Sequence, residues 1–157
     1  MARSTPATIE LTRAKVAFTV HTYDYDPAAD SIGLQAADAL GEVPARVLKS
    51  LMAKVDGNPV CVVLPSDRTV NMKKLAAVFH GKSAEMMVPA DAERMSGYKV
   101  GGISPFGQKR KVRTVIEESA MGETLVYING GQRGLQVRLS PADARTLLDA
   151  VAAGVSN

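Results

Sequence analysis

Apolar side chains occupy every second position in several short stretches of the chain, and this alternation predicts β-strands with one apolar face. The alternating stretches lie at residues 16–23, 112–116, 125–127 and 135–139. Two longer apolar runs, residues 47–55 and 59–64, flank Asp56-Gly57-Asn58. A glycine-containing turn between two such runs is a strong hairpin signal. A further strand is expected at residues 85–88.

Between these strands, apolar residues recur at the three- and four-residue spacing that predicts amphipathic helices. Ser, Thr or Asn ahead of most of these apolar stripes and Gly behind most of them supply the expected boundaries. Helices are therefore predicted at residues 5–15, 31–41, 71–81, in a short segment ending at 96–97, and at 140–154. In the last helix we expect Leu147, Leu148 and Val151 to pack inward and Gly154 to end the helix.

Strands joined by hairpins, with helices between them, predict an α+β fold built on a mixed β-sheet. The 157 residues are expected to form one domain, 1–157, which is long enough to bury a core without disulfides. Cys61 is the single cysteine, and no apolar run approaches the ~20 residues of a membrane span. Residues 1–6 lack the apolar core of a signal peptide. We therefore expect a cytoplasmic protein that does not bind a membrane.

The net charge of +3 is unevenly distributed along the chain. Four cations, Lys109, Arg110, Lys111 and Arg113, fall within six residues. Such a run is either a solvated face or a binding surface for the phosphates of an anionic polymer. The chain has no Trp and only 4% aromatic residues, which argues against a platform that stacks bases. For a nucleic-acid partner we therefore expect contact through phosphates and one inserted end.

Two glycine-rich strings hold six of the 13 glycines, at residues 100–107 and 127–134. Each contains a Gly-Gly pair, which lets the backbone take positive φ and approach a bound group closely. Loops of this kind can direct N–H groups at a ligand oxygen. The alternative is that both strings are tight turns between strands. Two strings in one chain favour a pocket.

Lys49 lies in the predicted strand 47–55, on the face that also carries Val47, Leu51, Ala53 and Val55. A lysine on such an apolar face has two interpretations. Its stem covers apolar surface while the ammonium reaches water, or the cation points into a cleft, where it binds phosphate or polarises a carbonyl.

The usual catalytic constellations are absent from the sequence. His21, His80 and Cys61 do not have zinc-ligand spacing, so neither a metal nor another cofactor is expected. Ser104 precedes Pro105, which has no N–H to form the oxyanion hole of a nucleophile elbow. The glycine spacing also fits neither a P-loop nor a dinucleotide fingerprint. A pocket of backbone donors plus a lysine remains, without an evident protein nucleophile.

Four segments of the chain resemble the YbaK family of free-standing aminoacyl-tRNA deacylases, which are related to the editing domain inserted in bacterial prolyl-tRNA synthetases. The resemblance rests on His21-Thr22-Tyr23-Asp24, Val47–Leu51, Gly97–Pro105 and Tyr127–Gly134. It extends over nearly the whole chain. The family's Gly-x-x-x-Pro loop corresponds to Gly101–Pro105 and its essential lysine to Lys49. One departure is Asn129, because this position is often Ser in the family.

The resemblance implies a YbaK-type fold with a barrel-like, mostly antiparallel sheet flanked by helices. It implies hydrolysis of a mischarged aminoacyl-tRNA, with cysteinyl-tRNA(Pro) as the substrate and the substrate's own thiol as the attacking group. Lys49 and Gly101 would be catalytic. The substrate would be bound by Tyr23, Ser50, Gly102, Ile103, Ser104, Pro105, Asn129, Gly130 and Gly131. The basic run at 109–113 would contact tRNA.

Alternatives remain open at this point. Related branches act on alanyl-tRNA, and a non-catalytic module that binds tRNA or a synthetase could keep the same fold. The expected partner is the aminoacylated end of tRNA, with prolyl-tRNA synthetase as a further candidate, and DNA is not expected to bind.

Overall fold

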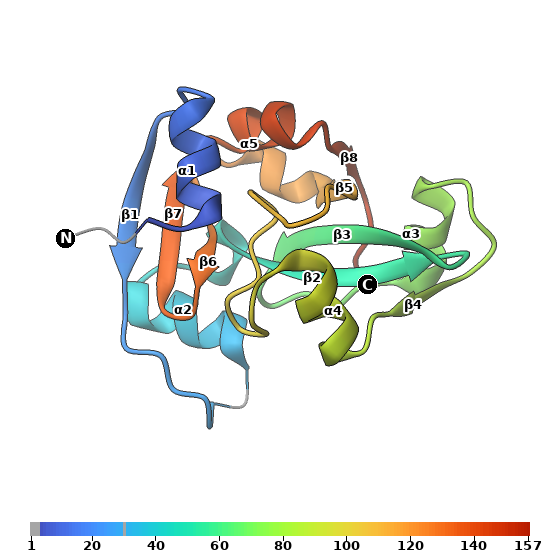
Figure 1. The fold of residues 1–157 in the computed structure, drawn as a ribbon, viewed down its shortest axis with the longest axis horizontal. Coiled ribbons are helices and arrows are strands. Elements are labelled where there is room, and N and C mark those ends of the chain that lie inside the picture. The colour runs from blue at the N-terminus through green and yellow to red at the C-terminus, as the bar shows by residue number, and fades with distance from the viewer. Residues whose placement is uncertain (1–3, 30) are drawn as a thin grey trace.

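The computed structural model describes residues 4–29 and 31–157 and contains five α-helices, two short 3-10 helices and eight strands (Figure 1). The helices are α1 (Pro6–Arg13), α2 (Ile32–Leu40), α3 (Met72–Val78), α4 (Pro89–Ser96) and α5 (Pro141–Leu148), with 3-10 helices at Pro44–Arg46 and Glu118–Gly122. The strands are β1 (Phe18–Thr22), β2 (Val47–Val55), β3 (Asn58–Pro65), β4 (Ala84–Met86), β5 (Arg113–Glu117), β6 (Val126–Gln132), β7 (Leu135–Leu139) and β8 (Val151–Ala153).

All eight strands belong to one sheet in the order β1-β7-β6-β2-β3-β5-β8, with β4 paired to β2 beside this path. The β2–β6, β3–β5 and β5–β8 pairs are parallel and the other four are antiparallel. The sheet turns strongly, so that β1, β7 and β6 stand upright in Figure 1 while β2 and β3 run across it. Within the described chain, β1 and β8 are its two ends, and the sheet is therefore curved but open. The predicted α+β class with a mixed sheet is confirmed.

The β2–β3 hairpin forms the centre of the core. Cys61 and Val63 pack into one apolar cluster, while Val60, Val62 and Leu64 pack into a second cluster on the opposite side. A strand covered on both faces needs a continuous apolar sequence, which explains the run that begins at Val60. The predicted hairpin is confirmed, with its turn at residues 56–57.

Side-chain caps fix the starts of several helices. Thr5 and Thr8 form a reciprocal capping box at α1, and the side chains of Ser31, Asn71 and Ser140 accept N–H bonds at α2, α3 and α5. These are the residues that the sequence places ahead of the apolar stripes, because a cap satisfies N–H groups that have no partner inside the helix.

The predicted end of the last helix is wrong. Helix α5 stops at Leu148 because Asp149 adopts a left-handed conformation (φ 51°), which ends the helical hydrogen-bond pattern. Val151 is 43% exposed and begins β8, which pairs with β5. The apolar residues after Leu148 therefore extend the sheet instead of forming another helical turn.

One edge of β2 is covered only at its two ends. Strand β6 pairs with Val47 and Leu48, and β4 pairs with residues 53–55. Between them, residues 49–52 have no strand partner on this edge among the described strands. The opening between β6 and β4 is where the candidate site lies.

Candidate active site

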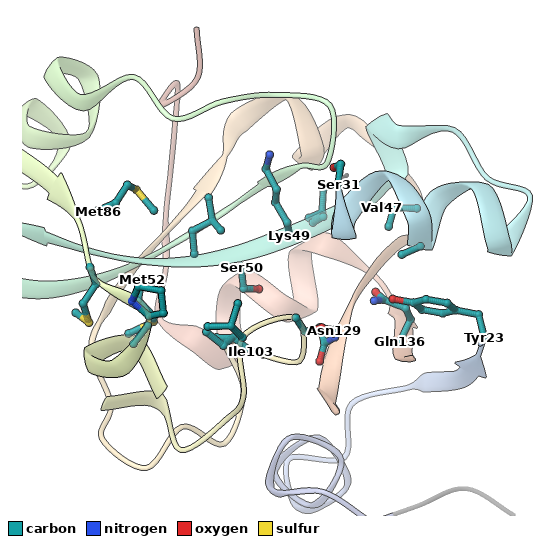
Figure 2. A pocket seen from close by; sticks show the side chains of 18 residues that line it. Tyr23, Ser31, Val47, Lys49, Ser50, Met52, Met86, Ile103, Asn129 and Gln136 are labelled. Atoms are coloured by element: carbon teal, nitrogen blue, oxygen red, sulfur yellow. Dashed lines mark hydrogen bonds between the residues drawn. The ribbon is translucent and has the colours of Figure 1, made fainter. Parts of the chain in front are cut away.

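A cavity of about 330 Å³ lies at the open edge of β2 (Figure 2). Its walls come from β2, β4, β6, β7, α2, α4 and the first glycine string. Because the cavity lies at the strand edge, side chains from both faces of β2 reach it. Figure 2 shows Lys49 pointing to one side of the strand and Ser50 to the other.

The cavity brings together six residues that the sequence singles out. Its lining includes Tyr23, Lys49, Ser50, Gly101, Ile103 and Asn129. Five other predicted site residues lie outside this lining: Gly102, Ser104, Pro105, Gly130 and Gly131. The site thus combines β2 with three positions of the first glycine string, Val100, Gly101 and Ile103, and one position of the second, Asn129.

Lys49 is half-buried at the cavity, with its Nζ donating to the carbonyl of Ser66 at 3.3 Å. The Ser66 hydroxyl in turn donates to the Val47 carbonyl at 2.7 Å, which ties this turn to β2. Burial lowers the pKa of Lys49, and the carboxylate of Asp67 partly offsets the shift. The ammonium therefore has a defined position with one acceptor among the described residues, and its other N–H bonds can reach a ligand.

Asn129 connects the two glycine strings. Its Nδ2 donates to the Gly101 carbonyl at 3.3 Å, and its Oδ1 accepts from the N–H groups of Gly131 at 2.7 Å and Gln132 at 3.2 Å. The last two bonds stabilise a register shift in the β6–β7 pair between Asn129 and Gln132. Asn129 thereby fixes the carbonyl of Gly101, which has a φ of 89°.

The two strings pack directly against each other. A Cβ on Gly102 would lie 2.7 Å from the backbone nitrogen of Arg133, closer than real Cβ contacts allow. The Arg133 Nε donates to the Val100 carbonyl at 2.9 Å. Gly102 therefore allows the close approach that positions Gly101 and Ile103 at the cavity.

Ser104 faces the protein interior and is fully buried. Its hydroxyl accepts from the Phe106 N–H at 3.2 Å, and its carbonyl accepts from Gln108 Nε2 at 2.9 Å. The next residue, Pro105, lines a second cavity of about 280 Å³. The hydroxyl thus stabilises the loop and is directed away from the main cavity.

Three buried polar atoms on the main cavity have no hydrogen-bond partner among the described residues: Tyr23 Oη, Ser50 Oγ and Gln136 Oε1. Burial raises the pKa of Tyr23, which the neighbouring Gln136 amide partly offsets. Buried polar atoms are nearly always paired in native proteins, so unpaired atoms on a cavity indicate ligand contacts, most directly at Ser50 Oγ, because Tyr23 and Gln136 also interact with each other.

Several lining residues were not among the sequence candidates. Gln136 lies directly opposite Asn129 in the β6–β7 pair. The one available signal was a polar side chain between apolar Leu135 and Val137, which is common in strands that face water on one side. Met52, Met86 and Met87 form an apolar end of the cavity, and their flexible thioethers suit a small apolar group.

The four cations of the basic run, Lys109, Arg110, Lys111 and Arg113, are all exposed, and none lies on the main cavity's lining. The Arg113 guanidinium lies 4.8 Å from the centre of the Phe79 ring. Within residues 4–29 and 31–157, no group of three or more His, Cys, Asp or Glu side chains could hold a metal ion. None of the described helices has the length and apolar character to cross a membrane.

Comparison with known proteins identifies related sequences. A family model described as an aminoacyl-tRNA editing domain matches residues 26–147. An Enterococcus faecalis protein named "Putative Cys-tRNA(Pro)/Cys-tRNA(Cys) deacylase EbsC" is 32% identical over 123 residues, which span 76% of this chain and 74% of that protein. The proline–tRNA ligase of Geobacillus thermodenitrificans is 32% identical over 96 residues, which span 61% of this chain and 16% of the ligase.

Solved structures share the fold. The structure of hypothetical protein APE2540 superimposes with a TM-score of 0.87 at 19% identity, covering 98% of this chain and all of the other. A structure described as "a putative trans-editing enzyme for prolyl tRNA synthetase" gives a TM-score of 0.81 at 18% identity, with 99% of each chain covered. The resemblance drawn from the sequence is confirmed by the family match.

Proposed function

Because this chain belongs to the aminoacyl-tRNA editing domain family, we propose that it hydrolyses the ester that joins a wrong amino acid to tRNA. The observation that carries the proposal is the cavity at the β2 edge, where a lysine and several unpaired polar groups converge. An aminoacyl ester is already activated, so catalysis requires chiefly positioning and stabilisation of the carbonyl oxygen. The volume of the cavity equals that of about eleven water molecules in the liquid, enough for a small aminoacyl group and part of the sugar.

The residues present favour catalysis without a protein nucleophile. Ser31 and Ser50 carry the two aliphatic hydroxyls on the lining, and the described lining residues include no His, Asp or Glu that could activate them. Cys61 is fully buried, and burial raises its pKa to about 12, so its thiolate is not available. The hydroxyl of Ser104 is directed away from the cavity. These observations favour water or the substrate itself as the source of the attacking group, with Lys49 kept for contact with the ribose or phosphate.

We assign cysteinyl-tRNA(Pro) as the substrate. The thiol of the cysteinyl group attacks its own carbonyl carbon, the bond to the ribose oxygen breaks, and the thiol proton passes to that oxygen. The products are free tRNA and a cyclic thiolactone, which water then opens to cysteine. The name of the Enterococcus faecalis relative and the methionine-lined end of the cavity support this choice.

The lining residues divide into three roles in this proposal. Lys49 contacts the terminal ribose or phosphate, and Gly101 and Ile103 shape the pocket around the acyl group. Tyr23 and Asn129 bind the sugar end. The remaining residues of the two strings, among them Gly102, Ser104 and Gly131, act by holding the loop in place.

Release of amino acid from purified cysteinyl-tRNA(Pro) tests the proposal, with seryl-tRNA and alanyl-tRNA(Pro) as comparison substrates. Cysteinyl-tRNA should be cleaved far faster than seryl-tRNA, because its thiol is the attacking group in this proposal. The two substrates differ by one atom, and a pocket could hardly discriminate between them by size, so a large rate difference would point to the thiol. Ser104→Ala should retain most activity. Equal rates with the two substrates would overturn the thiol mechanism, and no release from any of the three would overturn the deacylase assignment.

The four exposed cations at 109–113 favour tRNA phosphate as a contact of this protein. Neutralising Lys109, Arg110, Lys111 and Arg113 together should weaken tRNA binding uniformly and flatten its salt dependence, with amino-acid selectivity unchanged. An unchanged salt slope would leave the run as a solvated face. The alternative source of phosphate contacts is then a partner, with prolyl-tRNA synthetase as the candidate. A wild-type protein that binds tRNA but releases no amino acid would identify a non-catalytic module.

A further inference from the structure

Around Ser50, β2 presents to the cavity a backbone edge that no described strand pairs with. In the β2–β4 ladder Ala53 lies opposite Met86, and the Met87 N–H donates to the Met52 carbonyl at 3.0 Å. Hydrogen-bonded positions recur every second residue in an antiparallel pair. The next such position along β2 is therefore Ser50, and the same register places it opposite Pro89.

Pro89 cannot continue the ladder. It has no N–H to donate, and helix α4 begins there, so the chain turns away from β2. On the other side, pairing with β6 ends at Leu48. The N–H and C=O of Ser50 thus point from the strand edge into the cavity that Ser50 and Pro89 both line.

Ser50 also marks the boundary between the two ends of the cavity. In Figure 2, Met52 and Met86 lie to one side of it, and Asn129, Gln136 and Tyr23 lie to the other. An aminoacyl ester has the same division, with an amino-acid side chain at one end, a ribose at the other, and the α-amino and carbonyl groups between them. Ser50 is at the position that these central groups would occupy.

We infer that the free edge at Ser50 binds the aminoacyl group as a strand binds one residue of a neighbouring strand. The Ser50 N–H donates to the ester carbonyl oxygen, and the Ser50 C=O accepts from the substrate's α-ammonium. Two opposed residues in a ladder exchange the same pair of bonds. The N–H contact strengthens as negative charge develops on the carbonyl oxygen during attack, and the C=O contact selects a free α-amino group. This inference rests on the proposed function and adds the backbone group that recognises the substrate.

A backbone substitution tests the donor without changing the side chain. Replacing Ser50 by its α-hydroxy acid analogue exchanges the N–H for an ester oxygen. Because this N–H has no ladder partner, the melting temperature should stay within a few degrees of the wild type, while kcat/KM for cysteinyl-tRNA(Pro) falls on the order of 10²-fold. The matched control is the same exchange at Ala53, whose N–H faces Val60 in the β2–β3 ladder. That variant should lose stability and retain kcat/KM. A Ser50 ester variant with wild-type kcat/KM would overturn the inference.

A binding measurement separates this inference from the proposed function. The probe is the amide analogue 3′-(L-cysteinylamino)-3′-deoxyadenosine, which the protein cannot hydrolyse as an ester, titrated against 15N-labelled wild-type protein. The Ser50 amide resonance should shift in a saturable manner, and the analogue without the α-amino group should bind about tenfold more weakly. A shift in a protein that releases no amino acid would contradict the proposed function and leave the inference standing. An unmoved Ser50 amide, or equal affinity for the two probes, would overturn the inference whatever the activity.

Discussion

Replacing Lys49 by methionine should reduce deacylation by about three orders of magnitude. Lys49 reaches the cavity from β2, and in the part of the chain that the structure describes its ammonium has one acceptor, the Ser66 carbonyl at 3.3 Å. At an effective dielectric constant of about 20, suited to a half-buried group, a unit charge about 4 Å from an anionic oxygen contributes about 4 kcal/mol. At about 1.4 kcal/mol for each tenfold change in rate, this equals on the order of 10³-fold in kcat/KM.

The same substitution should change the free energy of unfolding by less than about 1 kcal/mol, because two small effects oppose each other. Methionine loses the bond to Ser66 but also removes the desolvation cost that lowers the pKa of Lys49. The lowered pKa sets the sign of the pH dependence. Between the folded value and the ordinary value of 10.5, the unfolded chain binds more protons. The wild type should therefore gain stability relative to Lys49→Met as pH rises through that window.

The assay is single-turnover release of cysteine from cysteinyl-tRNA(Pro), with thermal unfolding measured in parallel. Lys54→Met is the matched control, since Lys54 lies on the same strand and makes only a 3.9 Å contact with Asp91. It should retain full activity. More than a tenth of wild-type activity in Lys49→Met would refute the catalytic role and leave Lys49 as a lysine that covers apolar surface. A large loss of stability would instead identify a structural contact.

Three further predictions concern the loop packing, the core and the C-terminal segment. Gly102→Ala should lower the free energy of unfolding by about 1–3 kcal/mol in urea titrations, because its Cβ would lie 2.7 Å from the backbone nitrogen of Arg133. The control Gly122→Ala, whose Cβ would have no atom within 4 Å, should leave the free energy of unfolding unchanged. Equal effects would refute the close packing of the two glycine strings. Glu117→Gln should lower the free energy of unfolding by about 2 kcal/mol in the same titration, since this buried carboxylate accepts from the Ser156 N–H at 3.2 Å. Unchanged stability would mean that a neutral acceptor suffices at this position. Cys61 should resist labelling by iodoacetamide at pH 8 in the folded protein and react once urea unfolds the chain, because burial raises its pKa to about 12. Rapid labelling of the native state would contradict its burial.

Much of the local structure could be predicted from the sequence because its causes are local. The Thr5 cap, the turn at residues 56–57 and the apolar run of β3 each depend on residues that are neighbours in the chain. The same holds for the family, since its motifs are short strings of adjacent residues. The wrongly predicted end of α5 has a non-local cause. Val151 pairs with β5, a strand more than thirty residues earlier in the chain.

Identifying the candidate site required both the sequence and the tertiary structure. Lys49 could be identified as a candidate from the sequence because a charged side chain is unusual on an apolar strand face. The sequence could not tell which residues of each glycine string reach the cavity, because Gly101 and Ile103 line it while Gly102 and Ser104 face other parts of the protein. The packing of the loops determines which of these residues line the cavity, and sequence periodicity carries no information on that packing.

The sequence by itself determined the five α-helices and seven of the eight strands, their order, the hairpin at the centre of the sheet and the family to which the chain belongs; it did not reveal β8. Only the tertiary structure decided that β6 and β4 cover opposite ends of the same β2 edge, and that Pro89 leaves Ser50 open between them. The reason is physical: helix caps, turns and periodicity follow from neighbouring residues, whereas the register between distant strands is set by the packing of the whole chain. The cavity exists because of that register.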